Sequence, residues 1–174
     1  MRIRTARADE LKHLQDIERA ADALFRDIGM PELADGDPHP LDDLANSQRQ
    51  GLAWVAVTED DTPVAFLTAE PLDGNLHVEQ LSVHPSHARK GIGRHLLDHA
   101  AAHASASGTP ALTLTTCADV PWNAPYYTRC GFHPLPDEAL GPSLRTRVDN
   151  EAANGLARWA RVCMRRPVDP SGPA

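Results

Sequence analysis

The stretch Arg89-Lys90-Gly91-Ile92-Gly93-Arg94 decides how this chain of 174 residues is expected to fold. The residues before it, 76–83, are typical of a β-strand, and from Ile92 to Ala104 apolar residues recur at helical spacing. Glycine lets the backbone approach a ligand closely, and the free N–H groups at the start of a helix attract anions. Strand, basic glycine turn and helix therefore predict a site for a phosphate or diphosphate group. The alternative is a turn that needs glycine only for its backbone conformation and whose basic side chains face water.

Two commoner phosphate-binding motifs are excluded by the residues around this turn. A dinucleotide fingerprint needs a third glycine or an alanine at the position of Leu96. A P-loop needs Gly-Lys followed by Ser or Thr after four intervening residues, and this stretch has no such sequence. The predicted anion site is therefore of another type.

Segments on both sides of the turn predict an α/β fold in one domain. Strands are predicted over 2–5, 52–58, 63–70, 76–83, 111–116 and 159–164, helices over 11–28, 41–50 and 92–104, a short helix between Pro121 and Gly131, and an amphipathic stretch over 146–154. No internal repeat separates these elements. We therefore expect a single domain over 1–166 and a flexible tail over 167–174.

The charge is distributed unevenly along the chain. The whole sequence holds 24 Asp and Glu against 17 Lys and Arg, a formal net charge of −7. Residues 1–80 carry 17 acidic and 7 basic residues, whereas residues 81–174 carry 7 acidic and 10 basic ones. The acidic half repels nucleic-acid phosphates, and no stretch interleaves basic and aromatic residues for base stacking. We therefore expect no nucleic-acid partner.

Hydropathy and cysteine content bear on location. No apolar run approaches the roughly 20 residues that span a bilayer, and the N-terminus runs directly into charged residues, so neither secretion nor a membrane partner is expected. The three cysteines, Cys117, Cys130 and Cys163, are too few for a disulfide framework. They favour a reducing compartment, and hence the cytoplasm, and are expected to be small buried residues rather than nucleophiles.

Two motifs resemble those of a known family. Leu81-Ser82-Val83-His84-Pro85, followed by the residues from Ala88 to Leu97, resembles the acetyl-CoA-binding motif of the GNAT superfamily of N-acetyltransferases. Tyr127-Thr128-Arg129-Cys130-Gly131-Phe132 resembles the second motif of that family. The resemblance implies the GNAT fold, with a central mixed, mostly antiparallel sheet flanked by helices, in which the strand at 76–83 splays from the strand at 111–116. It also implies an acyltransferase that uses acetyl-CoA as co-substrate.

The resemblance assigns residues to the cofactor side. Leu81 and Val83 match the family residues whose backbones pair with pantetheine. The family residues that bind the diphosphate are matched by Arg89, Lys90, Gly91, Ile92, Gly93 and Arg94. One position departs from the family pattern, because Ala88 stands where Gln or Arg is usual. Asn123 is expected either to hydrogen-bond the pantetheine or only to cap the helix that follows it.

Direct acyl transfer also needs a general base and a general acid. Tyr127 matches the family tyrosine that protonates the leaving thiolate. The alternative is that Tyr127 is only an aromatic residue of the core, and the adjacent Tyr126 is the rival candidate for the acid. Family members carry a base at positions matching Glu79 or His77, which alternate on one face of the same strand. We rank Glu79 above His77. Its alternatives are a solvated carboxylate or a group that binds the substrate ammonium, and a water chain can also carry the proton.

The predicted reaction is transfer of the acetyl group of acetyl-CoA to a primary amine of a small cationic molecule, within a ternary complex. The alternatives are an acyl-CoA sensor without turnover, and an acetyltransferase of protein lysines or N-termini. The identity of the acceptor depends on the loops at 30–50 and 134–150, whose residues do not by themselves identify it. His95, His99 and His103 have the four-residue spacing of zinc ligands, but no third ligand is evident, so no metal is expected. Relatives are often dimers, which leaves a homodimer open.

Overall fold

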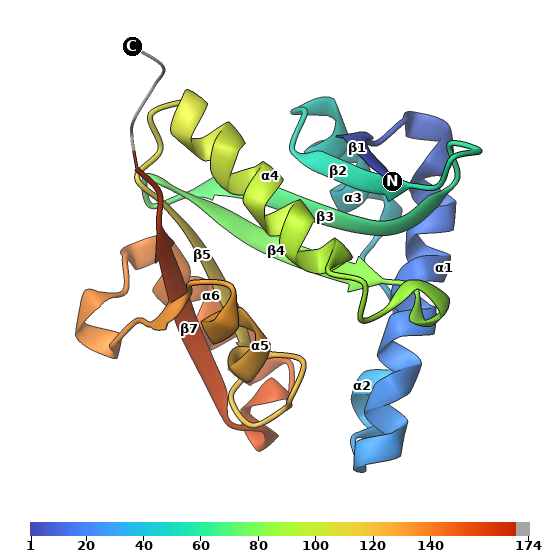
Figure 1. The fold of residues 1–174 in the computed structure, drawn as a ribbon. Helices are drawn as coiled ribbons and strands as arrows, with labels where there is room; N and C mark the ends of the chain where they lie inside the picture. The colour runs from blue at the N-terminus through green and yellow to red at the C-terminus, as the bar shows by residue number, and fades with distance from the viewer. Residues whose placement is uncertain (170–174) are drawn as a thin grey trace. The chain divides into compact units, whose positions relative to one another are not determined.

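The computed structural model describes residues 1–169 and contains a seven-stranded mixed sheet (Figure 1). The strands are hydrogen-bonded in the order β1-β2-β3-β4-β5-β7-β6. Their bounds are β1 Arg2–Thr5, β2 Ala53–Val57, β3 Pro63–Leu72, β4 Asn75–Val83, β5 Ala111–Cys117, β6 His133–Pro134 and β7 Arg161–Pro167. β4 and β5 run parallel, whereas β1–β2, β2–β3, β5–β7 and β6–β7 are antiparallel pairs. The predicted fold class, a mixed and mostly antiparallel sheet flanked by helices, is confirmed.

Six α-helices are found in the described part of the chain. Their bounds are α1 Leu11–Asp22, α2 Pro31–Ala34, α3 Leu41–Arg49, α4 Ile92–Ala106, α5 Ala124–Arg129 and α6 Pro142–Ala153. Short 3-10 helices cover Ala8–Glu10, Ala23–Ile28, Pro85–His87, Asp137–Ala139 and Leu156–Arg158. Within residues 1–169, each helix is too short or too polar to cross a bilayer.

The chain divides into two compact units. The first comprises 1–69 and 80–99, and the second comprises 70–79 and 100–174, of which 170–174 lie outside the described residues. β3, β4 and α4 therefore contribute residues to both units. Of the tail predicted over 167–174, Pro167 belongs to β7, and the last five residues lie outside the described part.

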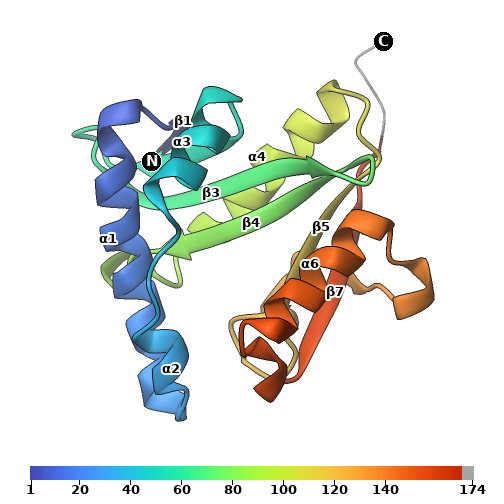
Figure 2. The same cartoon turned by 180° about the vertical axis from the view of Figure 1, so that it is seen from behind.

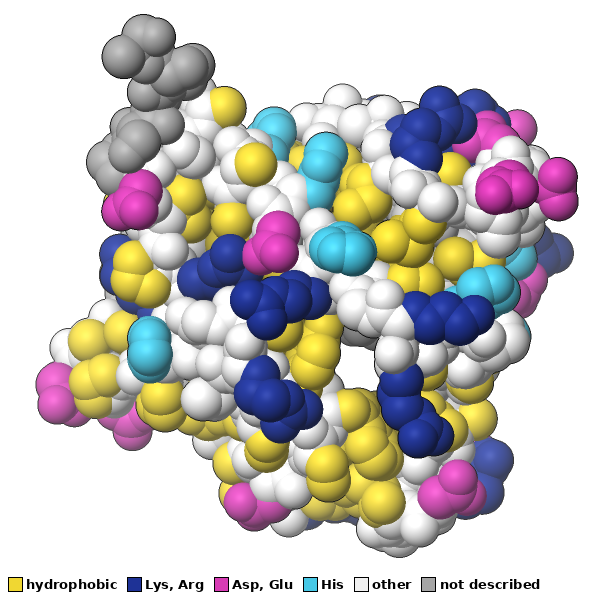
Figure 3. All heavy atoms as spheres, viewed as in Figure 1, with side chains coloured by type: hydrophobic (Ala, Val, Ile, Leu, Met, Phe, Trp, Pro, Cys, Tyr) yellow, Lys and Arg dark blue, Asp and Glu magenta, His cyan; other side chains and the backbone are white. Residues whose placement is uncertain are grey.

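The first unit packs helices on both faces of its strands. α4 lies on one face of the sheet, and α1 and α3 lie on the other (Figures 1 and 2). The apolar stripe of α1, spaced at three and four residues, meets the inward faces of the strands. This core consists of Ala6, Leu11, Leu14, Ile17, Leu44, Ala53, Val55, Val57 and Phe66. At the surface, Lys and Arg side chains lie beside Asp and Glu side chains near the β2–β3 turn (Figure 3).

The second unit is built on the long β5–β7 ladder, whose register runs from Ala111 opposite Pro167 to Cys117 opposite Arg161. α6 covers one face of these strands (Figure 2), and α5 lies on the other (Figure 1). The β3–β4 turn at Asp73 and Gly74 also belongs to this unit. Its Asp73 carboxylate reaches the start of α6, which places the hairpin end beside that helix.

Most boundaries shift by one or two residues from the sequence-based expectations, and three elements differ more clearly. The first helix keeps α-geometry only to Asp22 and continues as a 3-10 helix to Ile28, before Gly29 ends it in the left-handed conformation. α6 begins at Pro142 rather than at 146, because proline fits the first turn of a helix and Asp73 accepts bonds from its first amides. β7 begins at Arg161 rather than at 159.

Candidate active site

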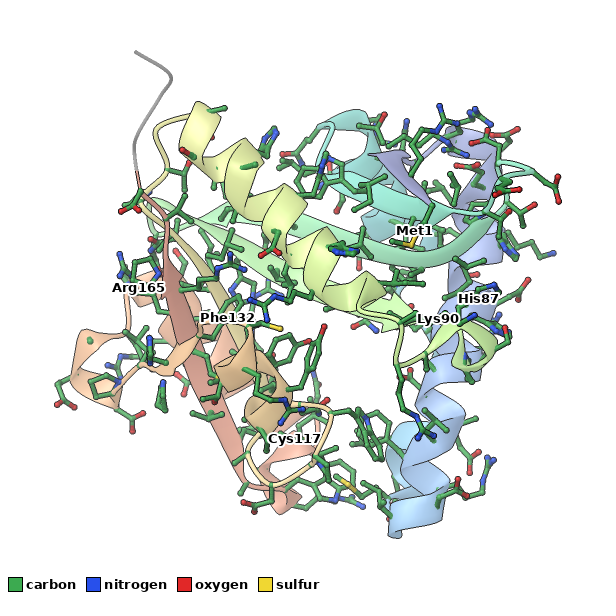
Figure 4. The ribbon with its side chains drawn as sticks, viewed as in Figure 1. Met1, His87, Lys90, Cys117, Phe132 and Arg165 are labelled. Atoms are coloured by element: carbon green, nitrogen blue, oxygen red, sulfur yellow. The ribbon has the colours of Figure 1, made fainter. Side chains whose placement is uncertain are left out.

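The glycine turn forms the entrance to α4 in the first unit. Arg89 has φ +60° and Gly91 has φ +76°, so two left-handed residues precede the helix that starts at Ile92. Successive turns of backbone in this conformation expose N–H groups and form anion-binding concavities. Arg89 and Lys90 are exposed, and Lys90 lies in the loop leading into α4 (Figure 4). Gly93 and Ile92 are buried, whereas Arg94 is exposed on the first turn.

Apart from Gly91 itself and its two chain neighbours, no atom of residues 1–169 lies within 4 Å of the position that a Cβ would take at Gly91. Its glycine is therefore required by the left-handed backbone rather than by crowding within the protein. α4 is 15 residues long, so its first-turn amides carry the positive end of a full helix dipole. Turn and helix start together form a surface suited to a diphosphate.

β4 leads into this turn. Near its start it pairs in parallel with β5, Leu76 with Leu112 and His77 with Thr113. Leu81 and Val83, in the first unit, are half-buried, whereas Ser82 between them is buried.

His77 is enclosed in the second unit. Its side chain is 1% exposed, and its Nδ1 lies 3.0 Å from the Thr113 hydroxyl. Burial lowers the pKa of His77 from 6.5 to about 4, although the nearby Asp73 carboxylate acts in the opposite direction. The imidazole is therefore neutral at neutral pH and a weak base.

Glu79, two residues further along β4, has a different environment. Its side chain is 17% exposed and lies 3.7 Å from Nη2 of Arg147 on α6. The same guanidinium pairs with Glu70 on β3. Two carboxylates from the two strands of the hairpin thus share one cation, and the three groups carry a net charge of −1.

Tyr127 lies in α5 of the second unit. Its amide donates to the Asn123 carbonyl at 2.9 Å, and its ring packs edge-on against Phe132 with 5.7 Å between centroids. Burial raises the pKa of the Tyr127 phenol, with a smaller contribution from Cys130. The phenol therefore holds its proton at neutral pH. Asn123 precedes α5 at its N-cap position, and its side chain makes no capping bond there.

The chain matches the model of the acetyltransferase (GNAT) family over residues 14–132. It belongs to the GNAT acetyltransferase family. It is accordingly an acyltransferase, as the two motifs indicated, and the predicted family is confirmed.

Solved structures share the fold of this GNAT acetyltransferase at low sequence identity. A GNAT acetyltransferase from Staphylococcus aureus Mu50 is 14% identical with a TM-score of 0.71, and the match covers 97% of this chain and 99% of that one. The ribosomal-protein-S18-alanine N-acetyltransferase of Escherichia coli is 17% identical, with a TM-score of 0.66 and coverage of 98% and 96%. The PaiA N-acetyltransferase of Thermoplasma acidophilum, solved with coenzyme A, is 16% identical, with a TM-score of 0.66 and coverage of 95% and 98%.

The structure divides the predicted site residues of this GNAT acetyltransferase between its two units. The first unit holds the candidates for the cofactor backbone, from Leu81 to Arg94. The second unit holds the candidates for proton transfer, His77, Glu79 and Tyr127, together with Asn123.

Three residues near these candidates were not foreseen from the sequence. Thr113 contacts His77, and Glu70 and Arg147 join Glu79. Arg147 is 77 residues from Glu70 in the sequence, so local patterning carries no sign of this contact. The one sequence signal was the position of Glu70 at the end of a predicted strand, which indicated that Glu70 lies close to the β3–β4 turn.

Within residues 1–169, no group of three or more His, Cys, Asp or Glu side chains is arranged to hold a metal ion. Cys117, Cys130 and Cys163 are buried free thiols. Burial raises the pKa of Cys163 to about 11, so this thiol is protonated and unreactive at neutral pH.

Proposed function

We propose that this GNAT acetyltransferase transfers the acetyl group of acetyl-CoA to the primary amine of a small cationic molecule, directly and within a ternary complex. The observation that carries the proposal is the left-handed turn at Arg89 and Gly91 at the entrance to α4. The T. acidophilum neighbour was solved with coenzyme A, which supports a coenzyme A thioester as co-substrate. The cytoplasm is the proposed location, since free thiols are typical of that compartment.

On the cofactor side, the backbone amides from Arg89 to Arg94 bind the diphosphate, and the exposed side chains of Arg89, Lys90 and Arg94 add positive charge. Backbone groups of Leu81 and Val83 pair with the pantetheine arm. The Asn123 side chain, which does not cap α5, is the proposed further partner of that arm. Ala88 brings no side-chain donor to the cradle, so the neighbouring amides and basic residues supply the binding.

On the acceptor side, Glu79 is the proposed general base. An ammonium group must lose a proton before its nitrogen can attack, and a partly exposed carboxylate can take that proton. His77 is the weaker candidate, because burial keeps it neutral with a pKa of about 4. The amine nitrogen then attacks the thioester carbon, the C–S bond breaks, and the thiolate receives the proton of the Tyr127 hydroxyl. The nitrogen loses its second proton as the amide forms, and through solvent this proton restores the Tyr127 phenol. Tyr127 suits that task because its raised pKa keeps it protonated.

The acceptor class follows from charge. Glu70 and Glu79 bring two formal negative charges and Arg147 one positive charge, so these three side chains together are net negative. A cationic amine is attracted to such a surface, whereas an acceptor with a carboxylate beside its amine is repelled. The E. coli neighbour carries a ribosomal protein in its name, so a peptide N-terminus belongs in any acceptor test.

The test is an amine screen with detection of the released thiol. Purified protein and acetyl-CoA are combined with diamines, polyamines, amino acids and a peptide with an N-terminal alanine, and acetyl-CoA binding is measured in parallel by calorimetry. Release of CoA with cationic amines supports the proposal. Binding of acetyl-CoA without release for any acceptor indicates a sensor, and release with the peptide alone indicates a protein acetyltransferase.

A further inference from the structure

α6 is held on the sheet by polar contacts at three successive turns. At its start, the Asp73 carboxylate accepts bonds from the amides of Ser143 at 3.1 Å and Leu144 at 2.8 Å. In its middle, Arg147 pairs with Glu70 and Glu79. Near its end, Glu151 accepts a bond from Thr115 at 2.6 Å. Electrostatic contacts therefore fix the position of this helix.

Apolar packing contributes little to the same contact. Leu144 is the one buried residue of α6. Val148, Glu151 and Ala152 line a cavity of about 410 Å³, and Leu144 lines another of about 340 Å³ near the β3–β4 turn. A helix packed in this way is poorly stabilised by burial. Its inward-facing charged residues are thus candidates for a role besides packing.

Arg147 lies between the proposed base and a second carboxylate. Its Nη2 atom is 3.7 Å from Oε1 of Glu79 and also pairs with Glu70. The side chains of Glu79, Glu70 and Arg147 are 17%, 29% and 30% exposed, so water screens these charges less than it screens a surface pair. A cation at this distance favours the ionised form of a carboxylate. A base that must take a proton has to be ionised first.

Glu70 limits this effect of Arg147. Its own negative charge offsets part of the positive potential that Arg147 exerts on Glu79, and its contact fixes the guanidinium in place. Two further titratable groups belong to the same β3–β4 hairpin. His77, two residues before Glu79 on β4, is neutral above about pH 5 because of its lowered pKa, and Asp73 is bonded to the start of α6.

We propose that Arg147 is a positioning residue for acetyl transfer. Held by Glu70, its guanidinium keeps Glu79 ionised and fixes the direction from which that carboxylate meets the acceptor ammonium. This inference rests on the proposed role of Glu79 as the base. It adds α6, which lies outside both sequence motifs, to the machinery of the reaction.

Two substitutions with opposite electrostatic effects test the proposal. Arg147→Met removes the cation, so the acidic limb of the kcat profile at saturating amine moves to higher pH by about one unit. Glu70→Gln removes the opposing anion, so the same limb moves to lower pH. Arg147→Lys keeps the positive charge but loses the planar guanidinium group. The acidic limb of its kcat profile therefore stays near that of the wild type, while kcat falls by about 3- to 10-fold.

A matched control lies on the same helix. Arg145 is exposed, and its guanidinium donates to the Asp137 carbonyl, so Arg145→Met is expected to leave the pH profile unchanged. Disturbed packing alone cannot move the limb in opposite directions in the Arg147 and Glu70 variants. The proposal is overturned if the acidic limb of the pH profile lies at the same pH in Arg147→Met and the wild type. It is also overturned if the limb moves in the same direction in Arg147→Met and Glu70→Gln. If Arg147→Met does not fold, the direction of the Glu70→Gln shift decides by itself.

Failure of the proposed function has a separate signature. Glu79→Gln must lose most of the activity while still binding acetyl-CoA in the calorimeter. Undiminished turnover in that variant removes Glu79 as the base, and with it the basis for the role of Arg147. Strong loss in Glu79→Gln together with an unmoved limb in Arg147→Met and Glu70→Gln rejects the role of Arg147 alone.

Discussion

His77 and Thr113 form a residue pair of the β4–β5 ladder, and their side chains are joined as well, with 3.0 Å between Nδ1 and Oγ1. A side-chain contact thus adds to the backbone pairing of the two strands at this position. The imidazole is buried, and its pKa falls from 6.5 to about 4 chiefly because burial disfavours the charged form. This histidine therefore supports the structure in its neutral state.

Protonation of His77 is expected to destabilise the fold. Below about pH 6.5 the unfolded chain binds a proton that the folded chain binds only near pH 4, so the free energy of unfolding falls as the pH drops through this range. The loss amounts to about 3 kcal/mol. Urea unfolding at pH 7 and 4.5 measures it. His77→Gln, which keeps a partner for Thr113 but does not titrate, should lose much less stability between the two pH values.

The exposed His103 provides the control, because His103→Gln should keep the pH dependence of the wild type. A His77→Gln variant with the same loss of stability as the wild type contradicts the assignment. In that case another group is responsible for the pH dependence.

Asp22 on α1 is expected to have the opposite pH dependence. Its pKa is raised from 3.8 to about 7, first by burial and then by the charge of Glu18 one helical turn earlier. Glu18 is itself buried and accepts a bond from the His39 amide at 3.2 Å. The folded chain thus keeps a proton that the unfolded chain releases near pH 4, and stability falls as the pH rises from about 4 to 7.

Asp22→Asn should therefore raise the free energy of unfolding at pH 8, by about 2 kcal/mol since the side chain is only partly buried, and leave it unchanged at pH 4. Thermal unfolding at the two pH values measures the difference. Asp16→Asn is the control, because Asp16 is exposed on the same helix and is expected to show no such gain. Equal stability of Asp22→Asn and wild type at pH 8 contradicts the raised pKa.

Local patterns in the sequence were sufficient for β4 and for the turn into α4, and the resemblance of two motifs supplied the fold family. The period of two over 76–83 predicted β4, and the glycines at 91 and 93 predicted the turn into α4, because each depends on residues close together in the chain. The same alternation placed His77 and Glu79 on one face of the strand. It could not tell that the first is 1% exposed while the side chain of the second is 17% exposed.

That difference comes from contacts distant in sequence. Thr113 is 36 residues beyond His77, and Arg147 reaches Glu70 across 77 residues. The start of α6 was missed for the same reason, since the carboxylate that accepts its first amide bonds belongs to Asp73 on the β3–β4 turn. The environments of His77 and Glu79 depend on tertiary packing, which a periodic sequence pattern does not encode. The choice between these two candidate bases therefore needs the structure.

Gly91→Glu is expected to weaken acetyl-CoA binding at least 10-fold. The substitution introduces a negative charge where the diphosphate is proposed to lie, and like charges repel. A matched control exists because Gly29 has the same φ of +76° and the same open space around its Cβ position. Gly29→Glu therefore bears the same backbone strain, so both variants should lose similar stability, about 1 kcal/mol.

Calorimetry with acetyl-CoA separates the two variants. Only Gly91→Glu should bind more weakly, whereas Gly29→Glu should bind like the wild type. Equal affinity in Gly91→Glu and wild type removes the turn from the diphosphate site. A matching loss in both variants shows that strain rather than charge is responsible.

Tyr127→Phe tests the proposed proton donor. The phenol is protonated at neutral pH because burial raises its pKa, so it can give a proton to the departing thiolate. Loss of a positioned general acid costs about 100-fold or more in rate. The variant keeps the ring that packs against Phe132, so kcat should fall by that amount while the Kd for acetyl-CoA changes less than about twofold.

Tyr126 supplies the control for this prediction. Its ring lies 5.5 Å from that of Tyr127, so Tyr126→Phe makes the same chemical change in the same helix. Its kcat should remain near the wild-type value. If Tyr126→Phe shows the loss and Tyr127→Phe does not, the roles of the two tyrosines are exchanged. If neither loses activity, the thiolate takes its proton from water, and the hydroxyl of Tyr127 has no part in the transfer.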